Sequence, residues 1–448
     1  MLWVTHGAGL ARWDGKQWSE FGPTQEAYNG FAIDPTDPKH MLVARHANDH
    51  HLDIYRSTDG GHNWQKINKV KSERLGWAPD WHFASSIFSL AFNPFNPKEV
   101  WFTDWYYAWR TSDITAQEVW ENRYEGHEEI VTTGMLLSSP GPGLALYSGV
   151  GDVGGFEHTS LTEPPATHAW KNGLDVLTST GIAIQETDPN FVVRVGGIGW
   201  DGQGRGGYST DGGETWHNFL SVPGARGRVA VSATSRRIVW ATQAGSIYVS
   251  EDLGKTWVQA EGLSSLIGGS NIFIYTQPMA ADKVDGDKLY AYRSGQFYRS
   301  DDGGYTWQPT GAYGLPNADN TRYVTVATSP GRAGEVYVAI GVSPDRYGLW
   351  RSTDYGKTFV RCMPVYAARL FAIGAPGPSG NPTLYVYGNV DEVQGIFRSE
   401  DNGETWVRID SAERTAGNEP NVMAADRKAF GRVFVGTNGN GIYYGEPA

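Results

Sequence analysis

The chain has 448 residues, which is enough for two or three ordinary domains or for one large domain built from repeats. Its net charge of −12 argues against nucleic acid as the main partner, because phosphate binding needs a basic surface. The single cysteine, Cys362, excludes an internal disulfide, and the absence of any apolar run of about 18 residues gives no reason to expect a membrane partner. The 57 glycines, 18 tryptophans and 23 tyrosines favour short strands and tight turns over long helices.

The first 21 residues have the pattern of strands two, three and four of a four-stranded unit. Met1 runs directly into the first of these strands, and no signal peptide is visible. A secreted or periplasmic location is still favoured, on the expectation that a signal segment has been removed.

An eight-residue pattern, S-x-D-x-G-x-T-W, then recurs along the chain. Each copy lies between two short apolar or aromatic runs, which is the layout of a β-hairpin. In such a turn the Asp can accept hydrogen bonds from backbone amides, the Gly can take a positive φ, and the Trp contributes a large apolar side chain to the packing. The copies, with Asn63 replacing Thr in the first and Phe359 replacing Trp in the fifth, occupy residues 57–64, 209–216, 250–257, 300–307, 352–359 and 399–406.

Because every copy serves the same local geometry, its Asp is predicted to anchor a turn and not to bind a ligand. These residues are Asp59, Asp211, Asp252, Asp302, Asp354 and Asp401. The pattern resembles the Asp-box, or bacterial neuraminidase repeat, of sialidases, sortilin and family 74 xyloglucanases. In those families the box is a hairpin within a β-propeller blade.

Degenerate copies at residues 10–18, 109–120 and 155–170 fill the gaps between the clear ones. Apolar first strands are predicted near residues 31, 90, 131, 181, 229, 271, 324, 369 and 422. Four strands in each unit of about 45 residues predict an all-β chain. We expect a single large propeller of about nine or ten four-stranded blades over residues 1–448, closed by pairing of its N- and C-terminal blades. Two smaller rings are the alternative.

Successive strands alternate in direction, so the loops joining second to third strands share a face with the connections between blades, and the boxes lie on the opposite face. Ligand chemistry is therefore expected in the first set of loops. Those richest in acids, histidines and aromatics are residues 46–51, 103–107, 151–155 and 196–201, together with the inter-blade stretch 77–82.

A closer resemblance is carried by four stretches in succession, N-P-F-N-P at 93–97, A-W-R-T-S-D at 108–113, G-H-E-E at 126–129 and G-D-V-G-G-F-E-H at 151–158, and by the end of the chain at 436–445. This succession resembles the second propeller of family 74 xyloglucanases. The resemblance implies a catalytic carboxylate at Asp152. At the matching position of the family's other catalytic Asp, this chain has His6.

Glycoside cleavage generally needs two carboxylates. Candidate partners for Asp152 are Asp104, Asp201 and Asp80, because their loops are expected on the same face in neighbouring units. Trp81, Trp105, Tyr106 and Trp200 occupy the same loops, and aromatic faces stack on sugar rings. The sequence thus favours a glycoside hydrolase of a plant-type or β-linked polysaccharide, with a polysaccharide or oligosaccharide as its partner.

Two alternatives stay open. A non-catalytic glycan- or peptide-binding propeller, similar to sortilin, needs the same fold without turnover. A polysaccharide lyase would use His6 or His82 as a base. Because His46, His50 and His51 lack a defined ligand geometry along their loop, neither a metal ion nor another cofactor is expected.

Overall fold

The computed structural model describes the chain except for residues 73–74, 117–118, 144–145, 170–171, 199–201, 267–274, 319–322, 342–346, 412–418 and 448. The regular elements of the described residues are β-strands, apart from one short 3-10 turn, η1 (Asp80–His82). No helix in this part of the chain has the length and apolar character needed to span a membrane. Contacts divide the chain into two compact units, residues 1–129 and 130–448, and each is described by itself.

Residues 1–129 form three sheets whose strands pair mostly in chain order. The three-stranded first sheet agrees with the pattern of residues 1–21. β8 joins the third sheet out of chain order, at the edge where it pairs in parallel with β12. The strands are β1 (Leu2–His6), β2 (Gly9–Trp13) and β3 (Trp18–Glu20); β4 (Tyr28–Ile33), β5 (Met41–Arg45), β6 (Ile54–Ser57) and β7 (Gln65–Lys66); and β8 (Val70–Ser72), β9 (Ser89–Asn93), β10 (Asn96–Thr103), β11 (Ala108–Thr111) and β12 (Val119–Asn122).

Residues 130–448 form five four-stranded sheets and one six-stranded sheet, in which two three-stranded groups pair with each other. The three-stranded groups are β13 (Ile130–Ser138), β14 (Leu146–Val150) and β15 (Phe156–His158), and β36 (Pro420–Ala425), β37 (Val433–Gly439) and β38 (Ile442–Gly445). The first four-stranded sheets are β16 (Thr178–Ile184), β17 (Val192–Ile198), β18 (Gln203–Ser209) and β19 (His217–Asn218), and β20 (Arg228–Val231), β21 (Ile238–Ala241), β22 (Ile247–Ser250) and β23 (Val258–Gln259). The others are β24 (Met279–Ala281), β25 (Leu289–Arg293), β26 (Gln296–Ser300) and β27 (Gln308–Pro309); β28 (Val324–Thr328), β29 (Val336–Ile340), β30 (Leu349–Ser352) and β31 (Val360–Arg361); and β32 (Val365–Pro376), β33 (Pro382–Val390), β34 (Val393–Ser399) and β35 (Val407–Arg408).

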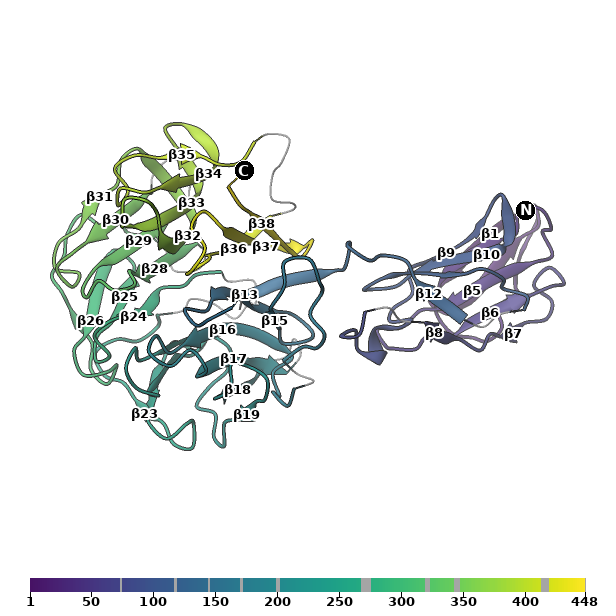
Figure 1. The fold of residues 1–448 in the computed structure, drawn as a ribbon. Helices are drawn as coiled ribbons and strands as arrows, with labels where there is room; N and C mark the ends of the chain where they lie inside the picture. The colour runs from purple at the N-terminus through teal and green to yellow at the C-terminus, as the bar shows by residue number, and fades with distance from the viewer. Residues whose placement is uncertain are drawn as a thin grey trace. The chain divides into compact units, whose positions relative to one another are not determined.

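The first strands of residues 130–448 contact one another in a closed order. β13, β16, β20, β24, β28, β32 and β36 follow in turn, and β36 contacts β13 again. Figure 1 shows these strands innermost, with the later strands of each sheet outside them. β37 also pairs with the start of β13 through Ile130–Gly439 and Val131–Asn438. The single ring over residues 1–448 stays a prediction that these contacts do not favour, because the C-terminal strands pair at residue 130.

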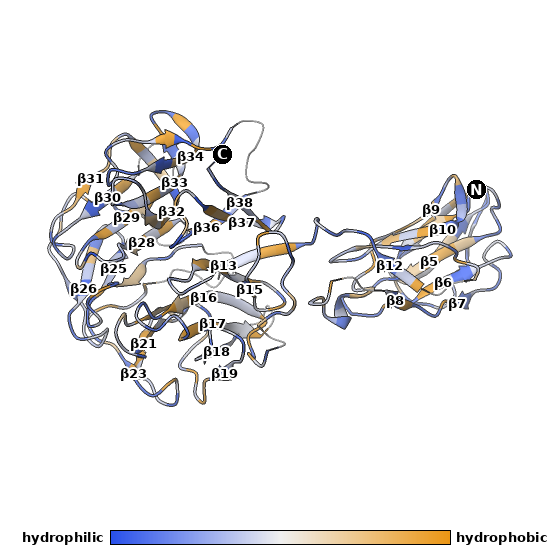
Figure 2. Ribbon diagram, viewed as in Figure 1, coloured by the Kyte–Doolittle hydropathy of each residue, from blue (hydrophilic) through white to orange (hydrophobic). Residues whose placement is uncertain are grey.

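The predicted first strands fall within the observed ones, apart from the strand placed near residue 271, which lies outside the described residues; the first strand of that sheet is β24. Apolar residues concentrate on the strands, and polar residues on the turns (Figure 2). The buried clusters lie between consecutive sheets. In one of them Trp307, which is fully buried, packs with Val239 and Ile247 of one sheet and Leu289 of the next.

The repeated hairpin turns are locked by their own side chains. Asp302 Oδ1 accepts bonds from Ser300 Oγ (2.8 Å) and the Thr306 amide (2.9 Å), and its Oδ2 accepts one from Thr306 Oγ1 (2.7 Å). Trp307 Nε1 donates to the Gly304 carbonyl at 3.0 Å. Corresponding amide bonds hold the turns of Asp59, Asp211, Asp252, Asp354 and Asp401. These bonds agree with the prediction that the six residues anchor turns.

Candidate functional site

Asp152 lies in the turn that joins β14 to β15, as predicted for a second-to-third loop. Its φ is +67°, a left-handed conformation that Asp and Asn tolerate better than most residues. Two glycines follow it at positive φ, and each is tightly enclosed. A Cβ on Gly154 would lie 2.3 Å from the Val176 carbonyl oxygen, and one on Gly155 would lie 1.9 Å from the Ser148 carbonyl oxygen. At positions 154 and 155 of the G-D-V-G-G run, no residue other than glycine fits without a backbone shift.

The turn is also held by Arg194 from β17 of the next sheet, a residue that is 1% exposed. Its Nη1 donates to the carbonyls of Ser148 (2.6 Å) and Gly154 (3.2 Å), and its Nη2 donates to that of Phe156 (3.0 Å). Burial lowers the pKa of Arg194 to about 10, so the guanidinium is still charged at neutral pH. Because these carbonyls flank Asp152 on both sides, Arg194 fixes the backbone that carries the carboxylate.

The sequence reasoning missed Arg194. The signal was present, since a lone arginine interrupts the apolar run Val192–Val193–Arg194–Val195 in the middle of a strand. A charge in such a strand is expected to be fully hydrogen-bonded or to have a specific task. Arg228 in β20 is a similar case, with its guanidinium bonded to the carbonyls of Thr276 (2.7 Å) and Thr180 (2.6 Å).

The unit of residues 1–129 contains three of the predicted aromatic residues, Trp81, Trp105 and Tyr106. His82 is 3% exposed; its ring stacks on Tyr106 (centroids 3.7 Å apart) and meets Trp81 edge-on at 4.2 Å. Trp105 is 51% exposed and lies 5.9 Å from the exposed ring of Phe88. The structure thus brings Trp81, Tyr106 and His82 into one cluster, and it leaves Trp105 with a face available for stacking.

Asp104 has the contacts of a turn anchor. Its two carboxylate oxygens accept bonds from the amides of Ala84 (2.9 Å), Tyr106 (3.0 Å) and Tyr107 (2.7 Å) and from Trp109 Nε1 (2.8 Å). Burial raises the pKa of Asp104 to about 7, although these N–H donors act in the opposite direction. The side chain positions the loop that carries Trp105 and Tyr106.

Asp80 and His6 are more accessible. The Asp80 side chain is 91% exposed and lies 2.8 Å from Lys71 Nζ. The His6 side chain is 37% exposed, with its Nε2 3.4 Å from Glu20 Oε2. His82, by contrast, directs Nδ1 at the Tyr107 hydroxyl at 2.6 Å, which leaves it poorly placed to meet a substrate as a base.

Trp200 and Asp201 lie outside the described residues. Asp152 belongs to one compact unit and both Asp80 and Asp104 to the other. The pairing of Asp152 with a second carboxylate therefore stays a prediction. In the part of the chain that the structure describes, no group of three or more His, Cys, Asp or Glu side chains is arranged to hold a metal ion.

Comparisons with known proteins match this chain to a beta propeller family and to xyloglucanases. The model of the family described as the DUF6242 beta propeller domain matches residues 198–444. A xyloglucanase of Paenibacillus sp. is 28% identical over 100% of this chain and 47% of its own length. A xyloglucanase of Acetivibrio thermocellus is 30% identical over 100% of this chain and 57% of its own length. The chain thus spans about half the length of the curated relatives it matches.

Solved structures agree in fold. The GH74 xyloglucanase from Xanthomonas campestris has a TM-score of 0.83 at 29% identity, covering 99% of this chain and 64% of that one. The GH74 enzyme of Niastella koreensis has a TM-score of 0.79 over 98% of this chain and 63% of that one, and at 24% identity it supports the fold alone.

Proposed function

We propose that this chain, which belongs to the DUF6242 beta propeller domain family, is a glycoside hydrolase of β-linked plant polysaccharides of the xyloglucan class, with Asp152 as a catalytic carboxylate. The observation that carries the proposal is the Asp152 turn. A left-handed Asp that is followed by two tightly enclosed glycines, in a turn whose flanking carbonyls bond a buried arginine, is held more rigidly than a solvated turn requires. Rigid placement of a carboxylate is what general acid or base catalysis needs. The xyloglucanase relatives supply the substrate class.

The candidates for the second carboxylate differ in accessibility. A retaining mechanism needs it about 5–5.5 Å from Asp152, and an inverting one about 6.5–9.5 Å. The Asp80 side chain is exposed and paired with Lys71, whereas both oxygens of Asp104 already accept two bonds each. We therefore give Asp104 the role of positioning the aromatic loop, and Asp80 and Asp201 stay candidates for the partner.

Each of the two compact units carries a separate feature of the proposed function. The first strands of residues 130–448 contact one another in a closed order, and residues 1–129 form three further sheets. The aromatic cluster of residues 1–129 is a candidate stacking surface for a glycan, and residues 130–448 carry Asp152.

A polysaccharide panel tests the function. The purified chain is expected to release reducing sugar from xyloglucan. Asp152→Asn, which tolerates the left-handed backbone, is expected to lower this rate by about 10²- to 10⁴-fold. Asp391→Asn is the matched control, because Asp391 is exposed, has φ +50° and lies in the β33–β34 loop that corresponds to the Asp152 loop.

The remaining classes are outcomes of the same assay. Glycan binding without sugar release would favour the non-catalytic propeller, for which the exposed Trp105 is the supporting observation. An unsaturated product that absorbs in the ultraviolet would indicate a lyase. Turnover unaffected by Asp152→Asn would overturn the assignment of that residue.

A further inference from the structure

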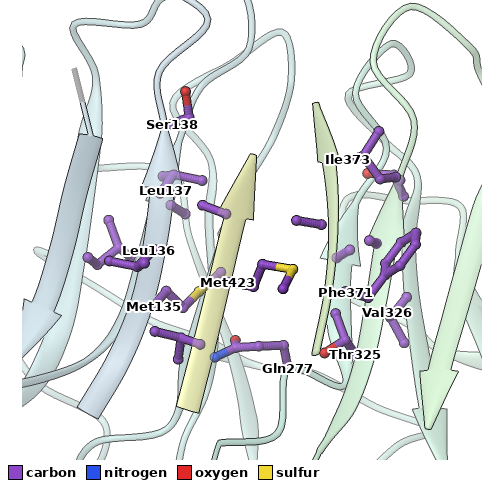
Figure 3. Close-up of a pocket in the computed structure, with 18 of the residues that line it drawn as sticks. Met135, Leu136, Leu137, Ser138, Gln277, Thr325, Val326, Phe371, Ile373 and Met423 are labelled. Atoms are coloured by element: carbon purple, nitrogen blue, oxygen red, sulfur yellow. The ribbon is translucent and has the colours of Figure 1, made fainter. Parts of the chain in front are cut away.

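The first strands of residues 130–448 enclose a cavity of about 200 Å³. Its wall is formed by side chains from all seven of these strands, and most of them are apolar. The residues labelled in Figure 3 come mainly from β13, β28, β32 and β36, with Ser138 towards one end and Gln277 towards the other. For comparison, an apolar cavity of about 150 Å³ stays dry and binds benzene, so a space of this size holds an aliphatic body of about six carbons.

One end of the cavity is bridged by hydrogen bonds between strands. Gln277 Nε2 donates to the Gly134 carbonyl at 3.3 Å, and Asn421 Nδ2 donates to the Tyr275 hydroxyl at 2.9 Å. Gly134 lies in the middle of β13, whereas Tyr275 and Gln277 lie just before β24 and Asn421 lies at the start of β36, on the face that carries the Asp152 turn. A ligand therefore reaches the cavity more readily from the opposite face.

At that opposite end the cavity is positively charged. Among the described residues that line it, Lys283 and Arg427 are the charged ones, and both are cations. They share one carboxylate, that of Glu186, which lies 2.5 Å from Arg427 Nη2 but 3.8 Å from Lys283 Nζ and does not line the cavity.

The neighbouring acids are engaged elsewhere. Asp282 accepts bonds from the Tyr290 hydroxyl (2.9 Å) and the Gly334 amide (2.8 Å), and Asp426 pairs with Arg432 at 2.9 Å. The cavity thus combines an apolar body with two cations that face one nearby carboxylate.

We propose that this cavity binds a small aliphatic monocarboxylate of about six carbons, with its chain between the first strands and its carboxylate on Lys283 and Arg427. The binding is separate from the proposed hydrolysis, because no residue of the Asp152 turn lines the cavity. Charge complementarity sets the headgroup, and the volume sets the length of the chain.

The test uses hexanoate with the whole chain and follows the methionine methyl groups by ¹³C NMR. Met135, Met279 and Met423 line the cavity, whereas Met41 and Met363 do not. Hexanoate is expected to shift the first three signals saturably and to leave the other two unchanged, and acetate is expected to shift none of them. Absence of these shifts up to tens of millimolar hexanoate would overturn the proposal.

Two comparisons test the headgroup. Lys283→Met is expected to weaken hexanoate binding by about tenfold or more, since a hydrogen bond to a charged group is lost. Lys255→Met, at an exposed lysine in a hairpin turn, is expected to leave it unchanged. Hexan-1-ol, which matches the chain length without the charge, is expected to bind about tenfold more weakly than hexanoate. Equal binding of the alcohol and the acid to the unaltered chain would contradict the charge argument even if Lys283→Met did not fold.

Discussion

The two compact units contain the same hairpin repeat but differ in how their sheets are arranged. In residues 130–448 the first strands follow one another in a closed order, so every sheet has a neighbour on each side and the inner strands enclose a cavity. In residues 1–129 three sheets follow in sequence, and the distinctive features are exposed or half-buried aromatic side chains. Locking a turn with Asp and Trp therefore specifies a sheet, whereas closing a ring depends on a separate pairing, here between β13 and β37.

The largest expected effect compares the two units through their box tryptophans. Trp307 is fully buried between two sheets, whereas Trp64 in the corresponding turn of residues 1–129 is half-buried. Trp307→Ala is expected to lower the free energy of unfolding by about 3–5 kcal/mol, because it leaves a cavity between the sheets. Trp64→Ala is expected to cost clearly less, and chemical denaturation measures both. Equal losses would mean that the two turns bury their tryptophan side chains to the same extent.

The next effect concerns the support of the Asp152 turn. Arg194→Lys removes the forked contact with carbonyls on both sides of Asp152 and is expected to lower kcat on xyloglucan by about 10- to 100-fold with little change in KM. Arg228→Lys is the matched control, because Arg228 is equally buried and carbonyl-bonded but does not touch the turn. An equal loss of kcat in both variants would reduce Arg194 to a general structural role.

A smaller effect tests the aromatic surface of residues 1–129. Trp105→Ala is expected to raise KM or weaken oligosaccharide binding by about 3- to 10-fold and to leave kcat unchanged, since stacking holds the sugar without taking part in bond cleavage. Trp18, which is also 51% exposed but lies outside the predicted site, provides the control variant Trp18→Ala. If Trp105→Ala and Trp18→Ala bind the oligosaccharide equally well, the surface around Trp105 does not bind the glycan.

The smallest effect is a pH dependence within residues 1–129. Burial raises the pKa of Asp104 to about 7, above the ordinary value of 3.8, so the folded state holds this proton more tightly than the unfolded state. The resulting stability is fully present below pH 3.8 and is lost as the pH rises through about 7. Urea denaturation between pH 5 and 7 is expected to show a decline on the order of 1 kcal/mol that Asp104→Asn removes. A decline that persists in Asp104→Asn would have another source.

Much of this fold follows from the sequence. The boxes, the alternating strands and the three-stranded units at both ends could be predicted because turn chemistry and the hydrophobic pattern act locally. The Asp152 turn could be placed on the correct loop for the same reason. The closed order of residues 130–448 could not, because it rests on a contact between Val131 and Asn438, which are far apart in sequence.

The candidate site also combines features that the sequence predicts with features that it does not. Trp81, His82 and Tyr106 were expected in one region because they share two neighbouring loops, and the structure brings them together. The burial of Asp104 was not foreseen, since its donors Ala84 and Trp109 come from separate segments. Arg194 was missed because a contact between sheets decides its role.

The most direct measurement is the titration of Asp152→Asn with a xyloglucan oligosaccharide, followed by calorimetry and by sugar release in the same sample. We expect a dissociation constant within about twofold of that of Asp391→Asn, together with a near-complete loss of cleavage, because a catalytic carboxylate acts on the bond and is not needed to hold the oligosaccharide. Cleavage by Asp152→Asn at the rate of Asp391→Asn would contradict this expectation.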